Sequence, residues 1–226
     1  MSSNGGAAPD IEIVKPAAIA GRLVVISSPS GGGKGTLIQR ILQTVPNLGY
    51  SVSFTTRPPR VDEVNGRDYF FVTTDEFLAM QQAGEFLESA LVHGNYYGTS
   101  RLQVESELKS GQDVILEIDV QGAALVRDRE SGALTIFILP PSFEVLAERL
   151  AARGTEKPGD VQIRLRNARG EVERYREFQY VIVNDDADRA SAQLAAVIAG
   201  DRARRERQEP VARQVMATFT ETDRSN

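Results

Sequence analysis

The chain has 226 residues, 41% hydrophobic and 25% charged, an ordinary globular composition at a length that fits one α/β domain with insertions. Its formal net charge of −5 argues against an overall basic nucleic-acid binder, and the absence of cysteine excludes disulfides and thiolate metal sites. No apolar run approaches a membrane span, and a chain without cysteine is compatible with a reducing cytosol. We therefore expect a cytoplasmic protein whose partners are neither nucleic acid nor membrane.

The two ends of the chain differ in composition from its middle. Residues 1–20 contain Gly5, Gly6, Pro9 and Pro16 and lack the cationic start and apolar core of a signal peptide, so we expect a mostly disordered leader. Residues 207–226 are polar, and we expect them to form a fraying tail. Residues 21–206 would then form the folded domain.

A glycine-rich stretch, SPSGGGKGT at residues 28–36, follows the apolar run of residues 23–26, which predicts a strand. From Lys34 to Pro46 the apolar residues fall on one helical face. This order of strand, glycine loop, lysine and helix is typical of a phosphate-binding loop, because backbone N–H groups and the helix N-terminus face the anion. The match to the strict phosphate-loop pattern is imperfect, since Ser28 replaces the first glycine and Gly35 follows the lysine. A flexible Gly/Ser loop is the alternative.

The next elements interrupt the alternation of strands and helices. Residues 50–56 and 69–72 predict short strands, and the sequence RPPR separates them. Thr73 opens a helix, with Glu76 completing a capping box, and Ser100 opens another that ends at Gly111. Residues 54–99 therefore predict an inserted β-rich lobe, and residues 21–53 and 100–206 form the core around it.

The second half resumes the alternation. Residues 113–119 and 134–139 predict strands, and Ser142 caps a helix whose expected core face contains Phe143, Leu146 and Leu150. A polar, arginine-dense stretch over residues 153–176 precedes a last strand at 181–183 and a helix from 187 to about 205. Strands that alternate with helices predict a doubly wound parallel sheet.

Two acids end the strand DVILEID, at Glu117 and Asp119. Ligands in such sheets bind beyond the carboxyl ends of the strands, and the period of two places both acids on one side. A carboxylate there can hold Mg²⁺ directly or through water. The alternative is a pair of solvated acids at a strand exit.

Two arginines flank the prolines of RPPR, at Arg57 and Arg60. A polyproline backbone with three residues per turn would project both guanidiniums to one side, an arrangement that suits a phosphate dianion. The hydroxyls of Tyr69 and Tyr97 could add donors to that phosphate. The alternatives are a surface linker and tyrosines of ordinary strand edges.

Five arginines lie in or near the polar stretch: Arg149, Arg153, Arg164, Arg166 and Arg169. With Gly154 and the Pro158-Gly159 pair as hinge, they predict a mobile lid at about residues 153–170 that neutralises phosphate charge. A solvated helix whose arginines pair with Glu171 and Glu173 is the alternative. His93, in a predicted turn, receives no catalytic role.

Over roughly residues 22–205 the chain resembles the guanylate kinases, nucleoside-monophosphate kinases that phosphorylate GMP. The motifs that carry the resemblance are SVSFTTRPPRVDEVNGRDYFFVTTDEF (residues 51–77), GEFLESALVHGNYYGTS (84–100), ILEIDVQGA (115–123) and VIVNDD (181–186). The resemblance implies a phosphate-loop nucleoside-monophosphate-kinase fold, an α/β fold with an inserted GMP-binding lobe and a helical lid. It implies ATP and GMP as substrates, with Mg²⁺ accompanying ATP, and leaves monomer and homo-oligomer equally open.

The resemblance also implies a role for each matching residue. Ser53, Glu88 and Thr99 would contact guanine, with Arg57, Arg60, Tyr69 and Tyr97 on the GMP phosphate. Glu63 and Glu117 would support that site, with Glu117 near the guanine edge. Ser30, Gly31, Gly32, Gly33, Lys34, Gly35, Thr36, Arg153, Arg166 and Asn184 would bind ATP, Asn184 near adenine. Lys34, Arg57, Asp119, Arg149 and Arg164 would act in catalysis, with Asp119 orienting Mg²⁺ through water.

The chain departs from the family pattern at three positions. Gly35 stands where the family usually has Ser or Thr, so either Thr36 or a water molecule would contact Mg²⁺. Glu117 stands where the family often has Asp, and Phe54 replaces a small polar residue beside Ser53. Two other functions stay open: a catalytically inactive phosphopeptide-binding module, and a kinase for another nucleotide, because Lys34-Gly35-Thr36 also resembles adenylate kinases.

Overall fold

The computed structural model describes residues 19–92, 94–152 and 158–222. The expected leader up to residue 18, His93, Arg153 and the Gly154 part of the expected hinge lie outside the described residues. The chain divides into two compact units, and the first of them, Ala20–Asp201, contains both the sheet and the lobe. Arg202–Asn226 belongs to the second unit.

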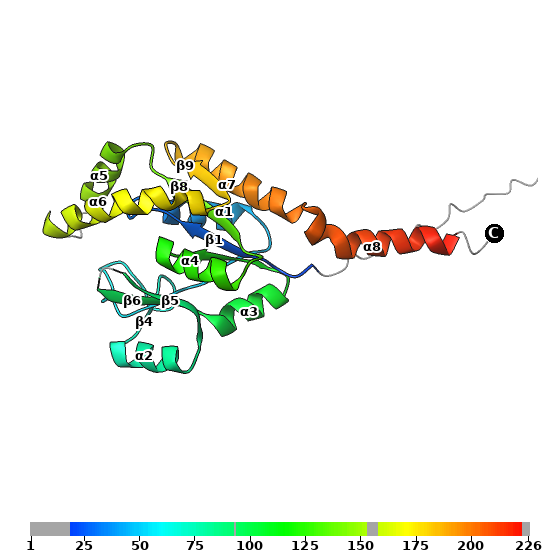
Figure 1. Ribbon diagram of the computed structural model, residues 1–226, viewed down its shortest axis with the longest axis horizontal. Coiled ribbons are helices and arrows are strands. Elements are labelled where there is room, and N and C mark those ends of the chain that lie inside the picture. Colours follow the sequence, from blue (N-terminus) through cyan, green and yellow to red (C-terminus); the bar gives the residue numbers. More distant parts are fainter. Residues whose placement is uncertain (1–18, 93, 153–157, 223–226) are drawn as a thin grey trace, which may run out of the picture. The chain divides into compact units, whose positions relative to one another are not determined.

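A parallel sheet forms the centre of the first unit (Figure 1). Every pairing between its neighbouring strands is parallel, which confirms the predicted sheet type. β1 and β8 are apolar runs with strongly buried residues, as expected of strands that helices cover on both faces. In spatial order the strands of the described residues are β2 (Leu48–Tyr50), β7 (Asp113–Glu117), β1 (Leu23–Ser27), β8 (Leu134–Leu139) and β9 (Tyr180–Val183).

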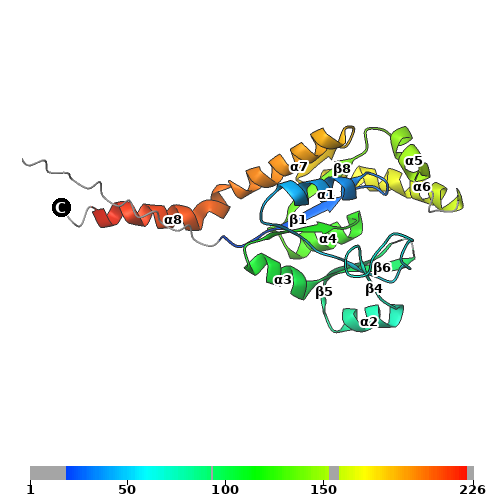
Figure 2. The same cartoon turned by 180° about the vertical axis from the view of Figure 1, so that it is seen from behind.

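Helices cover both faces of this sheet, as a doubly wound fold requires (Figures 1 and 2). α1 (Lys34–Thr44) and α7 (Ala187–Arg202) pack on one face, where Ile38 and Leu194 join one buried cluster. α3 (Arg101–Lys109) and α4 (Val120–Arg129) pack on the other face. No helix is predicted from the sequence over the residues of α4.

The inserted lobe is a second, mixed sheet with an aromatic core. Its strands lie in the order β4 (Phe70–Phe71), β3 (Phe54–Thr55), β6 (Asn95–Ser100) and β5 (Phe86–Val92). The ring of Phe77, on α2 (Thr74–Gln82), stacks on Phe86 at 4.5 Å between centroids. The capping box between Thr73 and Glu76 is present as predicted.

The prediction of one continuous strand over residues 50–56 is wrong. The segment divides into β2 of the central sheet and β3 of the lobe. Residues 51–53 join the two strands and have no regular secondary structure, although the Ser51 N–H still donates to the Ile115 carbonyl at 3.0 Å. The chain passes from one sheet to the other here, and Ser53 lies at that crossing.

The arginine-dense stretch is helical. α5 (Phe143–Ala152) is followed by α6 (Pro158–Glu173) and a 3₁₀ turn, η1 (Arg174–Glu177). The expected core face of α5 is wrong at Phe143, which is 38% exposed, whereas Leu146 and Leu150 are buried with Ala168. The Arg169 guanidinium lies 4.8 Å from the Phe143 ring centroid and covers part of it.

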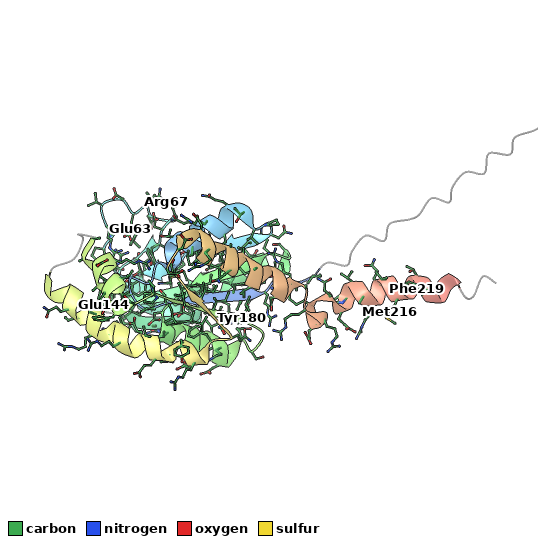
Figure 3. All side chains as sticks on the ribbon, turned by 90° about the horizontal axis from the view of Figure 1, so that it is seen from above. Glu63, Arg67, Glu144, Tyr180, Met216 and Phe219 are labelled. Carbon is green, nitrogen blue, oxygen red and sulfur yellow. The ribbon has the colours of Figure 1, made fainter. Side chains whose placement is uncertain are left out.

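The polar C-terminal segment forms a helix instead of a fraying tail. α8 (Arg205–Thr222) contains Pro210 and exposes the side chains of Met216 and Phe219 (Figure 3). Ion pairs between residues one turn apart on its surface, such as Arg213 with Glu209 at 3.0 Å, stabilise this helix. Within the described parts of the chain, no helix is long and apolar enough to cross a membrane.

Candidate functional site

The phosphate loop lies where two neighbouring parallel strands end. Ile26 of β1 pairs with Glu117 of β7, so the loop after β1 and the acid at the end of β7 meet at one edge of the sheet. Gly31 and Gly33 have φ of +88° and +86°, a region that favours glycine. A Cβ on Gly33 would also lie 2.4 Å from the Asn184 Nδ2 atom, so a larger residue there would disrupt the loop.

One cavity of about 310 Å³ joins this loop to the lobe. Ser28, Ala90, Val92, Ile118 and Glu171 contribute to its lining without having been predicted as site residues. The expected residues that line the cavity are Ser30, Gly31, Gly32, Gly33, Lys34, Gly35, Thr36, Ser53, Arg57, Arg60, Tyr69, Glu88, Tyr97, Glu117, Asp119 and Arg164. Those that lie outside the lining are Glu63, Thr99, Arg149, Arg166 and Asn184.

Arg57 and Arg60 converge on the cavity, and Glu63 holds both. The Arg57 Nη2 atom lies 2.8 Å from Glu63 Oε1, and the Arg60 N–H donates to Glu63 Oε2 at 2.8 Å. Burial favours the neutral form of Glu63, but the bonds from the two arginines outweigh it and lower the pKa of the carboxyl. Two fixed guanidiniums beside Tyr69 and Tyr97 form a corner of the cavity that suits an anion.

A buried carboxylate lies deeper in the lobe, at Glu88, which is 3% exposed. The Thr99 hydroxyl donates to its Oε1 at 2.6 Å. A Cβ on Gly122 would lie 2.8 Å from the other oxygen, so only glycine lets α4 approach the carboxylate this closely. Burial raises the pKa of Glu88 to about 7, with the charge of Asp119 adding to the rise and the bond from Thr99 opposing it.

Lys34 and Glu117 face each other across the loop. The Lys34 Nζ atom lies 3.6 Å from Glu117 Oε1, and the Tyr50 hydroxyl donates to Glu117 Oε2 at 3.1 Å. Burial, followed by the charge of Glu117, raises the pKa of Tyr50 well above its usual range, so its hydroxyl stays protonated and donates. Glu117 is therefore fixed from β2 while its free side faces the loop.

Asp119 does not continue the strand that ends in Glu117. It is the N-cap of α4, and its Oδ1 accepts from the Gly122 N–H at 2.9 Å. The expectation that the period of two places both acids on one side of the strand therefore does not apply, because β7 ends at Glu117. Both carboxylates nevertheless line the cavity.

Helix α6, which covers most of the predicted lid region, contacts the phosphate loop at Ser30. Arg164 donates to the Ser30 hydroxyl at 3.2 Å, and Glu171 accepts from the Ser30 N–H at 3.1 Å. A carboxylate therefore lies on a loop amide of the kind that binds phosphate oxygens. The Glu171 carboxylate, for which an ion pair with an arginine of the same stretch was the alternative, thus reaches the phosphate loop.

Arg149 and Asn184 lie outside the cavity lining and hold the loop through hydrogen bonds. Asn184 donates from Nδ2 to the Gly32 carbonyl at 3.0 Å, and Arg149 donates to the Asn184 carbonyl at 2.9 Å. The Arg149 Nη1 atom is buried and forms no hydrogen bond with the described residues, and it lies 3.7 Å from the Cβ position of Gly33. Arg166 lines a neighbouring cavity with Asn167.

Comparisons with known proteins agree with this geometry. A family model described as guanylate kinase matches residues 20–201. The chain belongs to the guanylate kinase family. It is 49% identical over 191 residues to the guanylate kinase of Alkalilimnicola ehrlichii, covering 84% of this chain and 94% of the relative, and 48% identical over 184 residues to that of Paraburkholderia xenovorans, covering 81% and 82%.

A solved guanylate kinase structure supports the fold. The crystal structure of the enzyme from Anaplasma phagocytophilum matches with a TM-score of 0.71 at 34% identity, covering 82% of this chain and 88% of that one. The predicted guanylate kinase fold, with its parallel sheet core, is thus confirmed.

Three residues that contact predicted site residues were not themselves predicted as site residues: Tyr50, Gly122 and Glu171. Tyr50 ends a strand of the central sheet, and only the three-dimensional pairing of β2 with β7 brings its hydroxyl to Glu117. Gly122 follows the capping acid Asp119 by three residues, a spacing that could have predicted the start of α4. No sequence signal connects Glu171 with Ser30, which is 141 residues away.

Proposed function

We propose that this member of the guanylate kinase family transfers the γ-phosphoryl group of ATP to GMP, giving ADP and GDP. The observation that carries the proposal is a single cavity with the phosphate loop of Lys34 at one side and the buried carboxylate of Glu88 at the other. The chain covers 82%, 94% and 98% of the length of three relatives named guanylate kinase, which supports the same activity for the whole protein.

We assign the ATP phosphates to the loop between β1 and α1. Residues Ser30 to Thr36 line the cavity, the amides at the N-terminus of α1 would bind the anion, and Lys34 adds a positive charge. Arg149 and Arg164 lie beside the loop and would neutralise charge on the transferred group, while Arg153 and Arg166 are proposed lid contacts. Asn184 fixes the loop through the Gly32 carbonyl and is assigned to the adenine side.

We assign the GMP phosphate to the corner formed by Arg57, Arg60, Tyr69 and Tyr97. Glu63 holds the two guanidiniums in place before substrate arrives, so less conformational entropy is lost on binding. A dianion between two fixed guanidiniums is the geometry that charge-assisted, paired hydrogen bonds favour.

Guanine is assigned to Glu88, with Ser53 and Thr99 beside it. The ionised carboxylate accepts from the guanine ring N–H and exocyclic amino group. Adenine has no ring N–H at that edge and would leave a buried charge unpaired, so such a site can discriminate by about 10⁴-fold. Thr99 occupies one oxygen of Glu88 and orients the carboxylate.

The donor set fits Mg²⁺ accompanying ATP. Mg²⁺ binds through one or two carboxylates together with substrate phosphates and waters, and does not need an all-protein cage. Among residues 19–92, 94–152 and 158–222 no three acidic or histidine side chains gather as a metal cage, while Asp119, Glu117 and the Thr36 hydroxyl line the cavity. Asp119, through water, and Thr36 would hold the ion, which would neutralise negative charge on the ATP phosphates.

The chain's own residues position the reactants and stabilise charge in the transfer step. The GMP phosphate oxygen attacks the γ-phosphorus in line, and the bond to the β-phosphate oxygen of ADP breaks. Lys34, Arg57 and Arg164 neutralise the charge on the phosphoryl oxygens. Closure of the lobe and of α6 would exclude water and limit ATP hydrolysis.

A coupled ADP-release assay with ATP and Mg²⁺ tests the proposal, with GMP, AMP, UMP and CMP compared as acceptors. ADP release confined to GMP is the expected result. Release with AMP would support the adenylate-kinase resemblance of the loop instead. A folded protein that releases no ADP with any acceptor would favour the phosphopeptide-binding module.

A further inference from the structure

Glu117 is bound from two sides, by Lys34 of the phosphate loop and by Tyr50 at the end of β2. Its Oε1 faces Lys34 Nζ at 3.6 Å, and its Oε2 accepts from the Tyr50 hydroxyl at 3.1 Å. Tyr50 is paired in register with Ile115 of β7, so the strand pairing itself sets the distance between this hydroxyl and the carboxylate two residues further on. No other acid forms an ion pair with Lys34 within the described residues.

Gly35 is part of the same arrangement. A Cβ built on Gly35 would lie 3.5 Å from Glu117 Oε1 and 3.8 Å from Oε2. The carboxylate thus occupies the space beside the residue after the lysine, where any side chain beyond Cβ would project. A longer side chain at position 35 would displace the carboxylate from Lys34.

We propose that Glu117 is a positioning residue for Lys34, that Tyr50 holds its carboxylate in the required orientation, and that Gly35 leaves the space that the carboxylate needs. This assignment rests on the proposed function of the loop as the ATP phosphate site, and it moves Glu117 from the guanine side to the ATP side. A flexible lysine stem loses less entropy on binding phosphate when its ammonium is already held near the loop.

A double-mutant cycle with Tyr50→Phe and Glu117→Gln tests the proposal. We expect Tyr50→Phe to lower kcat and to weaken ATP binding, measured by titration calorimetry, by about threefold to tenfold, the effect of one lost hydrogen bond of ordinary strength. The KM for GMP should change less, by under about twofold, because both variants leave Arg57, Arg60 and Glu88 unaltered and reach the lobe only through the charge of Glu117 near Tyr69. The double variant should resemble Glu117→Gln alone, because Tyr50 acts only through Glu117.

Controls separate positioning from stability. Tyr180→Phe removes a hydroxyl from β9, away from the cavity, and should leave kcat and ATP affinity unchanged. Unfolding temperatures of all variants show whether a loss follows from a weakened fold. Calorimetric ATP binding does not require transfer, so the expected shift in ATP affinity without GMP phosphorylation would contradict the proposed function and still support Glu117 as the partner of Lys34.

A second pair of variants tests the space at Gly35. Gly35→Val would push the Glu117 carboxylate away and lower kcat, and adding Glu117→Asp, which shortens the side chain by one carbon, should restore part of the loss.

Three results would overturn the proposal: full additivity of Tyr50→Phe and Glu117→Gln, a loss confined to the KM for GMP, or tighter ATP binding with unchanged kcat in Glu117→Gln. The last result would mean that Glu117 only repels phosphate.

Discussion

The Thr99 hydroxyl donates to the buried Glu88 carboxylate at 2.6 Å, across the antiparallel pair of β5 and β6. A hydroxyl that donates to one carboxylate oxygen stabilises the ionised form, while burial favours the protonated form. The balance keeps Glu88 close to its titration point near neutral pH. The residue assigned to guanine is therefore expected to respond to pH.

We predict that GMP use depends on the ionised form of Glu88. Since burial raises the pKa of this carboxyl to about 7, the fraction that can accept from guanine falls as pH falls below that value. kcat/KM for GMP should decline through this range, and the KM for ATP should not. Because the GMP phosphate also titrates nearby, the control is Glu88→Gln, whose residual activity should lack the step that depends on Glu88.

The same carboxyl should lower the stability of the folded protein as pH rises, although the rise in pH favours GMP use. A raised pKa means that the folded protein holds this proton more tightly than the unfolded chain, so the contribution of Glu88 to stability is largest at low pH and is lost as pH rises through about 7. Above that pH, Glu88→Gln should unfold at a higher temperature than the parent, as measured by calorimetry. A lower unfolding temperature of Glu88→Gln at alkaline pH would contradict the burial of an unpaired charge.

Glu63 is predicted to act through the two arginines that it holds. Glu63→Gln removes the charge that pairs with Arg57 and Arg60 and should raise the KM for GMP by about threefold to tenfold, the effect of one lost hydrogen bond of ordinary strength. ATP affinity should not change. Asp62→Asn, a neighbouring exposed acid on the same loop, is the matched control, and an equal effect of both variants would argue for a general charge effect.

Glu171 is predicted to compete with ATP for the loop. Its carboxylate accepts from the Ser30 N–H, so its charge opposes an incoming phosphate. Glu171→Gln should therefore tighten ATP binding by about twofold to fivefold in calorimetric titration. Glu173→Gln, an exposed acid on the same helix, should have no such effect. Weaker binding in Glu171→Gln would show instead that the contact stabilises the loop for ATP.

Lys34→Ala should retain the fold and lower turnover by about 10²-fold or more, through lost stabilisation of the transferred charge. The Nζ atom lies at the surface of the cavity with one ion pair to Glu117, so its removal leaves no strongly buried partner. Circular dichroism and the coupled assay together check this. Turnover within about fivefold of the parent would remove Lys34 from the transfer step.

Local signals in the sequence were enough to predict much of the core. The apolar runs of β1 and β8, the helix after Lys34 and the capping box at Thr73 follow from neighbours within a few residues, and the structure confirms each of them. Alternation of these elements was enough to predict a parallel sheet with helices on both faces.

Elements whose local signals conflict were missed. Asp119 was interpreted only as a metal-binding acid, which hid its role as the N-cap of α4, and Gly122 lowers the helix propensity of that segment. α8 contains Pro210, which normally interrupts a helix, and its surface is polar. Phe143 fits an apolar helix face by spacing, but the Arg169 guanidinium covers its ring at the surface.

The parts of the site that depend on tertiary structure could not be predicted. The contacts of Tyr50 with Glu117 and of Glu171 with Ser30 join residues that are 67 and 141 positions apart. No local periodicity encodes these distances, because they arise from the order of strands in the sheet and from the packing of α6. The identities of the site residues could be predicted from the sequence. The contacts by which these residues hold one another in place could not.

The most direct test of the central claim is to identify the products formed from equal amounts of ATP and GMP with Mg²⁺, by phosphorus NMR. The proposal predicts ADP and GDP in equal amounts and almost no inorganic phosphate, since the cavity joins the Lys34 loop and the Glu88 pocket. ADP with inorganic phosphate in place of GDP would contradict it, because the phosphoryl group would then have passed to water.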